Sequence, residues 1–157
     1  MRFRPYAVGA GSVLSRQWTD PSTMLYPRIG GDAAKIQRAG GVVGMGSHGE
    51  IPGFGFHWEM EAHVQGGMTP HEALRAGTLG SAEAIGRAAE FGSIEPGKFA
   101  DLAILEADPR DDIRNSRTAV QVMKNGRLYD AATLDEIWPR QKPLDPPWFA
   151  GERPTLR

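Results

Sequence analysis

The sequence predicts an α/β fold, and three observations along the chain indicate it. A short apolar run bounded by glycines, residues 42–46, is typical of a buried parallel-type strand. Helix-start and helix-stop signals then dominate residues 57–86. From Gly92 onward the period of the apolar residues changes, and residues 120–129 have the pattern of two alternating strands joined by Asn-Gly. Helices therefore give way to a small β unit.

Size, charge and cysteine content restrict the function classes. The 157 residues suffice for one domain or two small pieces, and the net charge of −1 predicts neither nucleic-acid nor anionic-membrane binding. The absence of cysteine excludes disulfides, thiolate nucleophiles and Cys-bound metals, so any metal must sit on His, Asp or Glu. No apolar stretch resembles a membrane span or a signal peptide. We therefore predict a cytoplasmic location for the chain as written and leave the compartment otherwise open.

The first third of the chain has weak secondary-structure signals. Residues 1–30 show neither apolar period and predict an irregular N-terminal extension. Asp32 is expected to cap a short helix over residues 33–39, which a Gly-Gly pair then stops. The run 42–46 is predicted to follow as a strand whose C-terminal end opens into a loop. In α/β folds that end of a strand is where ligands bind.

The helical region carries sharper signals. A helix is predicted over residues 57–65, ended by a second Gly-Gly pair. Thr69, Pro70 and Glu72 form the pattern of a capping box with proline at the first helical position. A further short helix is expected over residues 81–86.

Turn residues organise the β unit. Pro96-Gly97 is typical of a type II turn, and a strand is predicted over residues 99–105. Asn125-Gly126 predicts a type I′ turn inside the 120–129 hairpin. The proline- and tryptophan-rich residues 131–157 are expected to form an extended arm laid across a surface.

Several short segments, taken in order, carry a resemblance to a known family. They are Val43–Ser47, Gly67–Arg75, Thr78, Ala84–Gly86, Gly92–Lys98, Ala100–Leu102 and Lys124–Arg127. Together they resemble the C-terminal part of an amidohydrolase-superfamily enzyme, especially its imidazolonepropionase-like members. The resemblance covers residues 31–149, and its Gly-Ser-Ile-Glu-Pro-Gly-Lys…Ala-Asp-Leu segment is a specific structural signature that carries no chemistry itself.

The resemblance implies a composite fold. Such enzymes are (β/α)8 barrels with a β-sandwich built from both chain ends, and a barrel needs about 250 residues. The implied fold is an incomplete C-terminal segment of a (β/α)8 barrel followed by strands of a small β-sandwich domain. The implied division is an irregular extension at 1–30, the last barrel strand and its helices at 31–91, sandwich strands at 92–130, and a Pro/Trp-rich arm at 131–157.

The resemblance also implies a metal site, from which this sequence departs. Family members bind one or two divalent metals through a His-x-His pair and further histidines, and no His-x-His occurs here. Where the family usually has Gly-Thr-Asp, this sequence has Gly46-Ser47-His48. We therefore expect His48 to be a catalytic and metal-binding residue and Glu50 to be a second candidate ligand, while His57 is a candidate substrate contact. Zinc is the expected metal of the complete enzyme, and a chain that binds no metal by itself is the open alternative.

Less specific interpretations stand beside these roles. His48 and Glu50 are also explained as polar loop residues, and for Glu50 that is the favoured explanation. His57, Glu59, Glu61 and His63 alternate on one predicted helix, but their i,i+4 pairs point to different sides, which predicts a solvated helix with ion pairs instead of one metal site.

Two further sets of residues are expected to be structural. The aromatic side chains beside the predicted helix, Phe54, Phe56 and Trp58, are expected to anchor a loop by burial. A surface role is predicted for His71 and a structural hydrogen-bonding role for Asp101.

The function implied by the resemblance is hydrolysis of carbon–nitrogen bonds other than peptide bonds. In the complete enzyme a metal-activated water would attack the carbonyl of a small-molecule amide or ester. Because most of the family's metal ligands are absent, the isolated chain is expected to have little or no activity. The alternative is a non-catalytic fragment that associates with a complementary chain or with itself, since exposed helix faces and an unpaired strand edge recruit partners.

Overall fold

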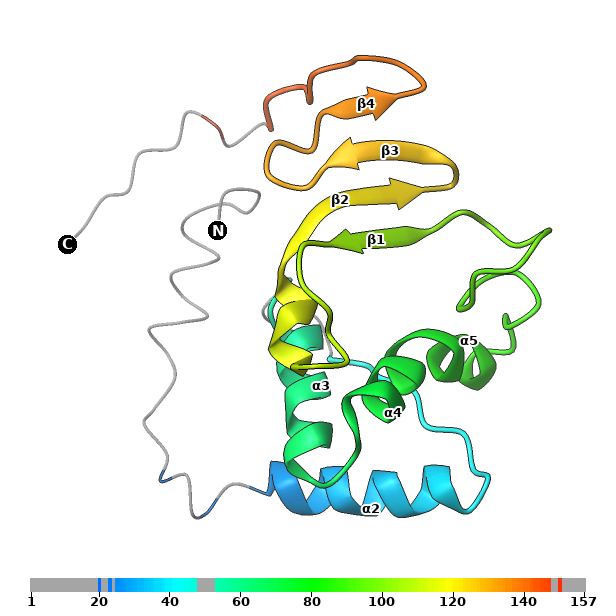
Figure 1. The fold of residues 1–157 in the computed structure, drawn as a ribbon, viewed down its shortest axis with the longest axis vertical. Helices are drawn as coiled ribbons and strands as arrows, with labels where there is room; N and C mark the ends of the chain where they lie inside the picture. Colours follow the sequence, from blue (N-terminus) through cyan, green and yellow to red (C-terminus); the bar gives the residue numbers. More distant parts are fainter. Residues whose placement is uncertain (1–19, 21–22, 24, 48–52, 148–149, 151–157) are drawn as a thin grey trace.

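The chain has an α/β architecture in which a helical half lies against one edge of a small antiparallel sheet (Figure 1). The computed structural model describes residues 20, 23, 25–47, 53–147 and 150. Its α-helices are α2 (Tyr26–Arg38), α3 (Gly55–Gln65), α4 (Pro70–Arg75) and α5 (Ser81–Ala84). The sheet contains β1 (Leu102–Leu105), β2 (Ala119–Lys124), β3 (Arg127–Asp130) and β4 (Glu136–Trp138) in that order.

Helix α2 begins seven residues earlier than predicted, inside the stretch expected to be irregular. Proline at the start of the helix is tolerated because its missing N–H has no intrahelical partner there. Asp32 is therefore not a cap; its carboxylate instead pairs with Lys35 at 2.9 Å on the exposed side of the helix. The prediction failed because two glycines in a row, Gly30 and Gly31, count against a helix when only propensity is considered.

Those glycines are explained by the contact between α2 and α3. A Cβ atom on Gly30 would lie 2.6 Å from the carbonyl oxygen of Ala62, and one on Gly66 would lie 2.5 Å from the carbonyl carbon of Gly30. Gly30 is buried at this contact. The two backbones therefore approach more closely than any residue with a side chain would allow.

The strand predicted over residues 42–46 is not formed within the described part of the chain. Residues 41–47 run without a β-ladder, and side chains bind part of their backbone. Ser81 accepts a hydrogen bond from the amide of Met45 at 3.0 Å. The segment passes so close to α5 that a Cβ on Gly80 would collide with the carbonyl oxygen of Val43. An apolar run has the composition of a strand, but a strand also needs a neighbouring strand to pair with.

The other helix signals are confirmed. Helix α3 ends at Gly66-Gly67, and Gly67 adopts a φ of 104°, in the left-handed region. The capping box is complete, since the Thr69 side chain accepts from the Glu72 amide and the Glu72 carboxylate accepts from the Thr69 amide. Helices α4 and α5 are joined by a π-helical stretch, η2 (Ala76–Gly80), so they form one continuous rod.

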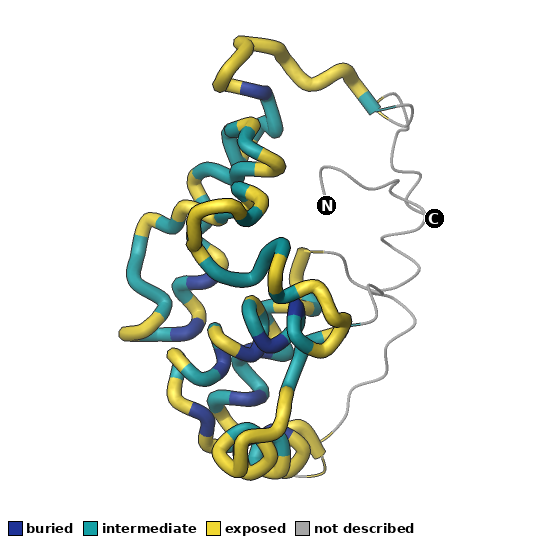
Figure 2. The backbone as a smooth tube through the Cα atoms, turned by 90° about the vertical axis from the view of Figure 1, so that its right-hand side faces the viewer, coloured by how far each residue is buried: buried dark blue, intermediate teal, exposed yellow. Residues whose placement is uncertain are grey.

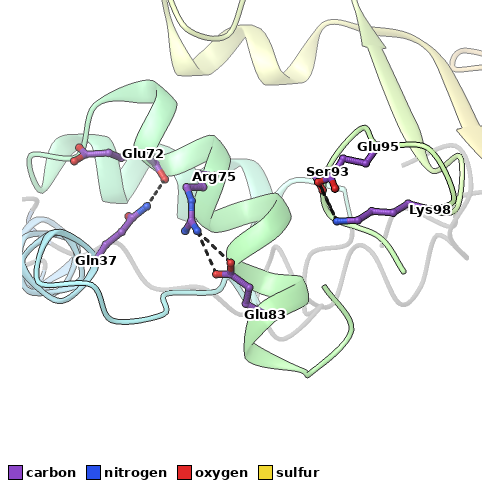
Figure 3. A network of polar contacts seen from close by, with 7 residues as sticks. All are labelled: Gln37, Glu72, Arg75, Glu83, Ser93, Glu95 and Lys98. Carbon is purple, nitrogen blue, oxygen red and sulfur yellow. Dashed lines mark hydrogen bonds and ion pairs between the residues drawn. The ribbon is translucent and has the colours of Figure 1, made fainter. Parts of the chain in front are cut away.

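Glu72 also ties α4 to α2. Its carboxylate accepts two hydrogen bonds from the Arg38 guanidinium, at 2.8 and 2.7 Å. Its carbonyl oxygen accepts from the Gln37 side chain at 3.2 Å (Figure 3). The hydrogen bond from Arg38, followed by that from the Thr69 amide, lowers the pKa of Glu72 from 4.5 to about 2. One carboxylate thus caps a helix and joins two helices.

Replacing Glu72 with glutamine is expected to lower the free energy of unfolding by about 1 kcal/mol at pH 7, since a charge-assisted pair and part of a cap are lost. Because the folded-state pKa is depressed, this stabilisation is present above pH 4.5 and is lost as the pH falls towards about 2. Urea unfolding of both proteins at several pH values measures the difference. Glu106→Gln, at an exposed site, is the matched control. An equal or pH-independent loss in both variants would contradict the assignment.

The β unit follows the predicted order. The Pro96-Gly97 turn is present, with Gly97 at a φ of 91° and the Lys98 amide bonded to the Glu95 carbonyl at 3.2 Å. The ammonium of Lys98 donates to Ser93 and Glu95 and fixes this turn (Figure 3). The hairpin is confirmed as well, since Asn125 and Gly126 have φ values of 48° and 76° and Lys124 pairs with Arg127.

Asp101, the residue just before β1, holds the turn of the β2–β3 hairpin. Its carboxylate accepts from the amide of Asn125 at 2.7 Å and pairs with the ammonium of Lys124. Its predicted structural role is confirmed.

The start of the predicted arm belongs to the sheet. Strand β4 pairs antiparallel with β3, and Glu136 forms a further bridge with Lys142. Glu136 is only 5% exposed and accepts two hydrogen bonds from Arg140, at 3.0 and 2.6 Å. A short strand next to several prolines gives little sequence signal, which is why the extended-arm prediction missed it.

The core lies in the helical half (Figure 2). Its buried members are mostly small or flexible: Ala34, Met60, Met68, Ala73 and Ile113. Ile113 comes from the 3-10 helix η3 (Ile113–Arg117), which connects β1 to β2 and packs on α3. In the described part of the chain, no helix combines the length and apolar character needed to cross a bilayer.

Candidate functional site

The two residues expected to bind metal, His48 and Glu50, lie outside the described residues. Their catalytic and metal-binding roles therefore stay predictions. The described chain reaches Ser47, which lies directly against the start of α3, since a Cβ on Gly55 would be 3.1 Å from the Ser47 side chain. The structure thus places the residues just before His48 beside the first turn of α3.

Glu59 fixes the approach to this region. Its two carboxylate oxygens accept from the amide of Gly46 at 3.2 and 3.1 Å, joining the end of the 41–47 segment to α3. This contact differs from the predicted role of Glu59 as a solvated helix residue. No local signal distinguishes it from other exposed glutamates, because the amide it binds lies 13 positions earlier in the chain.

His57, the candidate substrate contact, is held by η3. Its Nδ1 atom lies 2.9 Å from the hydroxyl oxygen of Ser116, which is only 6% exposed. Burial lowers the pKa of His57 below 6.5, the positive charge of Arg117 lowers it further, and Glu61 opposes both effects. These effects together favour the neutral form of the ring. Sequence reasoning missed Ser116 and Arg117, because only packing of η3 on α3 brings them to His57.

The lowered pKa of His57 predicts a pH-dependent stability. As the pH falls below 6.5, the unfolded chain takes up a proton before folded His57 does, so the free energy of unfolding decreases until the folded ring is also protonated. His57→Asn, which keeps a polar side chain of similar reach without titrating, should show a smaller decrease between pH 7 and 5. His71→Asn makes the same replacement at an exposed histidine of α4 and serves as the control. Equal slopes in all three proteins, measured by urea unfolding, would contradict the argument.

The alternating His and Glu residues of α3 have different partners. Glu61 forms an ion pair with Arg117 of η3. His63 is only 8% exposed, and its Nδ1 atom lies 2.7 Å from the backbone oxygen of Glu59. The prediction of a solvated helix face with internal ion pairs is therefore wrong for His63, because α2 packs over this side of α3. His71 is exposed, as predicted.

The aromatic residues at the start of α3 are not buried as predicted. Phe54, Phe56 and Trp58 are 48%, 36% and 44% exposed. Phe54 stacks on Trp58 with ring centroids 5.7 Å apart, and Phe56 meets the edge of the His57 ring at 5.8 Å. Phe54 and Trp58 thus pack on each other, one helical turn apart, whereas the Phe56 ring lies against η2, where a Cβ on Gly77 would be 3.0 Å from it.

The described residues do not fit a metal-ligand set. Within the described ranges no three His, Asp or Glu side chains come together in a way that could hold an ion. His57 faces Ser116, His63 faces the backbone of its own helix, and His71 is exposed on α4. A catalytic zinc site needs three protein ligands and an open position, and the described side chains do not provide that set.

Comparison with known proteins gives a consistent result. Residues 29–129, more than half of the chain, match the model of the Amidohydrolase family. Imidazolonepropionase of Shouchella clausii is 58% identical over 64 residues, which is 39% of this chain and 14% of that protein. N-substituted formamide deformylase of Arthrobacter pascens is 44% identical over 57 residues, 36% of this chain and 10% of that protein. The chain spans between 9 and 15% of the length of the curated relatives it matches.

A solved structure extends the similarity to most of the chain. The crystal structure of a Xaa-Pro dipeptidase with bound methionine in its active site matches with a TM-score of 0.59 and 25% identity. The match covers 80% of this chain and 32% of that one. The helical half and the sheet are thus similar to part of a larger protein.

Proposed function

Because the chain belongs to the amidohydrolase family, we propose that it forms part of a hydrolase acting on carbon–nitrogen bonds other than peptide bonds. The family match over residues 29–129 is the observation that carries this proposal. The names of the relatives refer to an imidazolone and to an N-substituted formamide, which supports a small-molecule amide as substrate. The dipeptidase similarity has lower sequence identity, 25% against 58%, so the non-peptide class is favoured.

The same family membership leads us to propose a more detailed fold for this chain. Residues 31–91 would form the end of a (β/α)8 barrel, and residues 92–130 would contribute strands to a small β-sandwich. Residues 41–47 support the assignment to a barrel. The segment is apolar, and it passes close to α5 without pairing with another strand in the described structure. The four-stranded antiparallel sheet supports the assignment to a β-sandwich.

The proposal places the metal ligands outside the described residues. The superfamily is typically metal-dependent, and the described side chains provide no set of three ligands. His48 and Glu50 are the candidates of this chain, and further ligands would come from elsewhere. Little or no hydrolysis is therefore expected from the isolated 157 residues.

A segment exchange tests the hydrolase proposal. In imidazolonepropionase of Shouchella clausii, the matched 64-residue segment would be replaced by that of this chain. The chimera is expected to keep more than about a tenth of the parent's kcat/KM, a loss of less than about 1.4 kcal/mol in transition-state stabilisation. A folded chimera with no activity would contradict the proposal. As a control, the corresponding segment of the Xaa-Pro dipeptidase would be replaced by that of this chain. This second chimera tests whether the segment simply fits any protein of this fold, and we expect it to keep a smaller fraction of the dipeptidase's activity.

Metal analysis tests the location of the ligands. The purified chain would be dialysed against zinc, freed of loosely bound ion and analysed for metal per chain. We expect no tightly bound equivalent. One tight equivalent that disappears in His48→Ala but persists in His71→Ala would show that the chain makes its own site, and would overturn the need for outside ligands.

A second candidate function is association without catalysis, and the exposed apolar side chains favour it. Val42, Ile85, Ile94 and Trp138 are 52%, 67%, 87% and 56% exposed, on both halves of the structure. Where such side chains form a contiguous surface, they recruit a partner chain or a second copy. Sedimentation velocity over a range of protein concentrations tests self-association. A monomer mass that stays constant over this concentration range would exclude self-association of the chain.

A further inference from the structure

A pocket of about 440 Å³ is lined by residues from the segment after α5 and from the β2–β3 hairpin, at the junction of the helical half and the sheet. Its lining is formed by Arg87, Phe91, Phe99, Asp101, Lys124 and Asn125. None of these residues belongs to the predicted hydrolytic site. The volume is within the range that accommodates a small organic molecule.

Two aromatic rings give the pocket an apolar surface. Phe99 is 48% exposed, and its backbone is fixed by a hydrogen bond from its amide to the Glu90 carbonyl at 2.8 Å. The second ring, Phe91, carries the guanidinium of Arg87 above it, 5.7 Å from the ring centroid. A flat apolar ligand could therefore cover the exposed ring of Phe99, whose backbone is anchored to Glu90.

The polar groups of the pocket have hydrogen-bond donors to spare and no free carboxylate. Both oxygens of Asp101 are occupied, one by the Asn125 amide and the other by Lys124. The Lys124 ammonium has three donors, of which one contacts Asp101. Arg87 uses one nitrogen on Glu90, and in the described structure the side-chain amide of Asn125 donates to no protein acceptor. Arg87 and Lys124 are each paired with one carboxylate, Glu90 and Asp101, and both keep further N–H donors, which favour a ligand with acceptor oxygens.

We propose that this pocket binds a small aromatic carboxylate, with its ring against Phe99 and its carboxylate between Arg87 and Lys124. An uncharged hydrocarbon would leave the donors unused, an aliphatic carboxylate would not stack on Phe99, and inorganic phosphate would leave both rings exposed. A cationic ligand would find no free carboxylate in the lining, since both oxygens of Asp101 are occupied. Planar guanidinium donors pair well with a carboxylate, and Arg87 is already oriented by Glu90 and Phe91.

Titration with naphthoate tests the proposal on the full 157-residue chain. Backbone amide chemical shifts of residues lining the pocket, such as Phe99 and Asn125, are expected to move and to saturate. Naphthalenemethanol, which has the same ring system without the charge, should bind about tenfold more weakly or worse, because a charge-assisted pair is lost. Shifts centred on the exposed Phe54–Trp58 stack, or equal binding of both compounds, would overturn the proposal.

Variants separate the pocket from general surface charge. Arg87→Gln is expected to weaken naphthoate binding about tenfold. Arg110→Gln is the matched control, since Arg110 is also an exposed arginine paired with one nearby carboxylate. Phe99→Leu, which keeps an apolar side chain, should weaken both compounds. Equal affinity of the Arg87→Gln and Arg110→Gln proteins would overturn the assignment, as would unchanged binding in Phe99→Leu.

Discussion

Gly66→Ala is expected to destabilise the protein by about 3 kcal/mol or more, the upper range for overpacking a tight contact. The new methyl group would lie 2.5 Å from the carbonyl carbon and 2.7 Å from the Cα of Gly30, and it would also collide with the amide of Gly31. These are backbone atoms of α2, so no rotamer change can relieve the overlap. The two helices would have to separate, and the buried contacts between them would be lost. Thermal or urea unfolding measures the effect.

Gly46→Ala is the matched control for this experiment. It makes the same chemical change, but within the described residues nothing lies within 4 Å of the added Cβ. Its φ is not in the left-handed region, so no backbone strain is introduced. We expect a change of less than about 1 kcal/mol. If Gly66→Ala were as stable as Gly46→Ala, the close contact of α2 and α3 would be wrong.

Met60→Ala is expected to lower the free energy of unfolding by about 3 kcal/mol. Met60 is 2% exposed and is the largest fully buried side chain among the described residues. Its neighbours in the core include Ala34 and Ala73, which have no flexible atoms with which to fill the space left behind. The cavity therefore adds to the loss of buried apolar surface. Urea denaturation compares the variant with the wild type.

Ile94→Ala provides the comparison for Met60→Ala. Ile94 is 87% exposed, so truncating it removes a large apolar side chain without opening a cavity. A change within about 0.5 kcal/mol is expected. A Met60→Ala protein that lost no more stability than Ile94→Ala would show that the small core of the helical half does not carry the fold.

Many elements could be predicted because their signals are local. The capping box joins Thr69 to Glu72, and the Asn125-Gly126 turn joins two strands that follow each other directly. Each depends on hydrogen bonds and φ values within a few residues, so a short sequence window contains the whole cause. The Gly92–Lys98 signature segment likewise pointed to the family that the matched residues 29–129 confirm.

The failed predictions concern residues whose partners lie far away in sequence. The start of α2 depends on glycines that fit against α3, and the 41–47 segment depends on Ser81 and Glu59 for its backbone partners. The exposure of the Phe54–Trp58 stack depends on which side of α3 the other helices cover. None of these causes is visible in a window of neighbouring residues.

The features of the candidate site also fall into those that are visible in the sequence and those that depend on tertiary packing. The sequence alone identified the departure at Gly46-Ser47-His48 and the lack of a His-x-His pair, because these are matters of residue identity. Only the tertiary structure decided that His57 contacts Ser116, that His63 is buried and that Glu59 binds the Gly46 amide. Local hydrogen bonds and residue chemistry depend only on neighbouring residues. The burial, pKa values and hydrogen-bond partners of these side chains are instead determined when segments distant in sequence pack together.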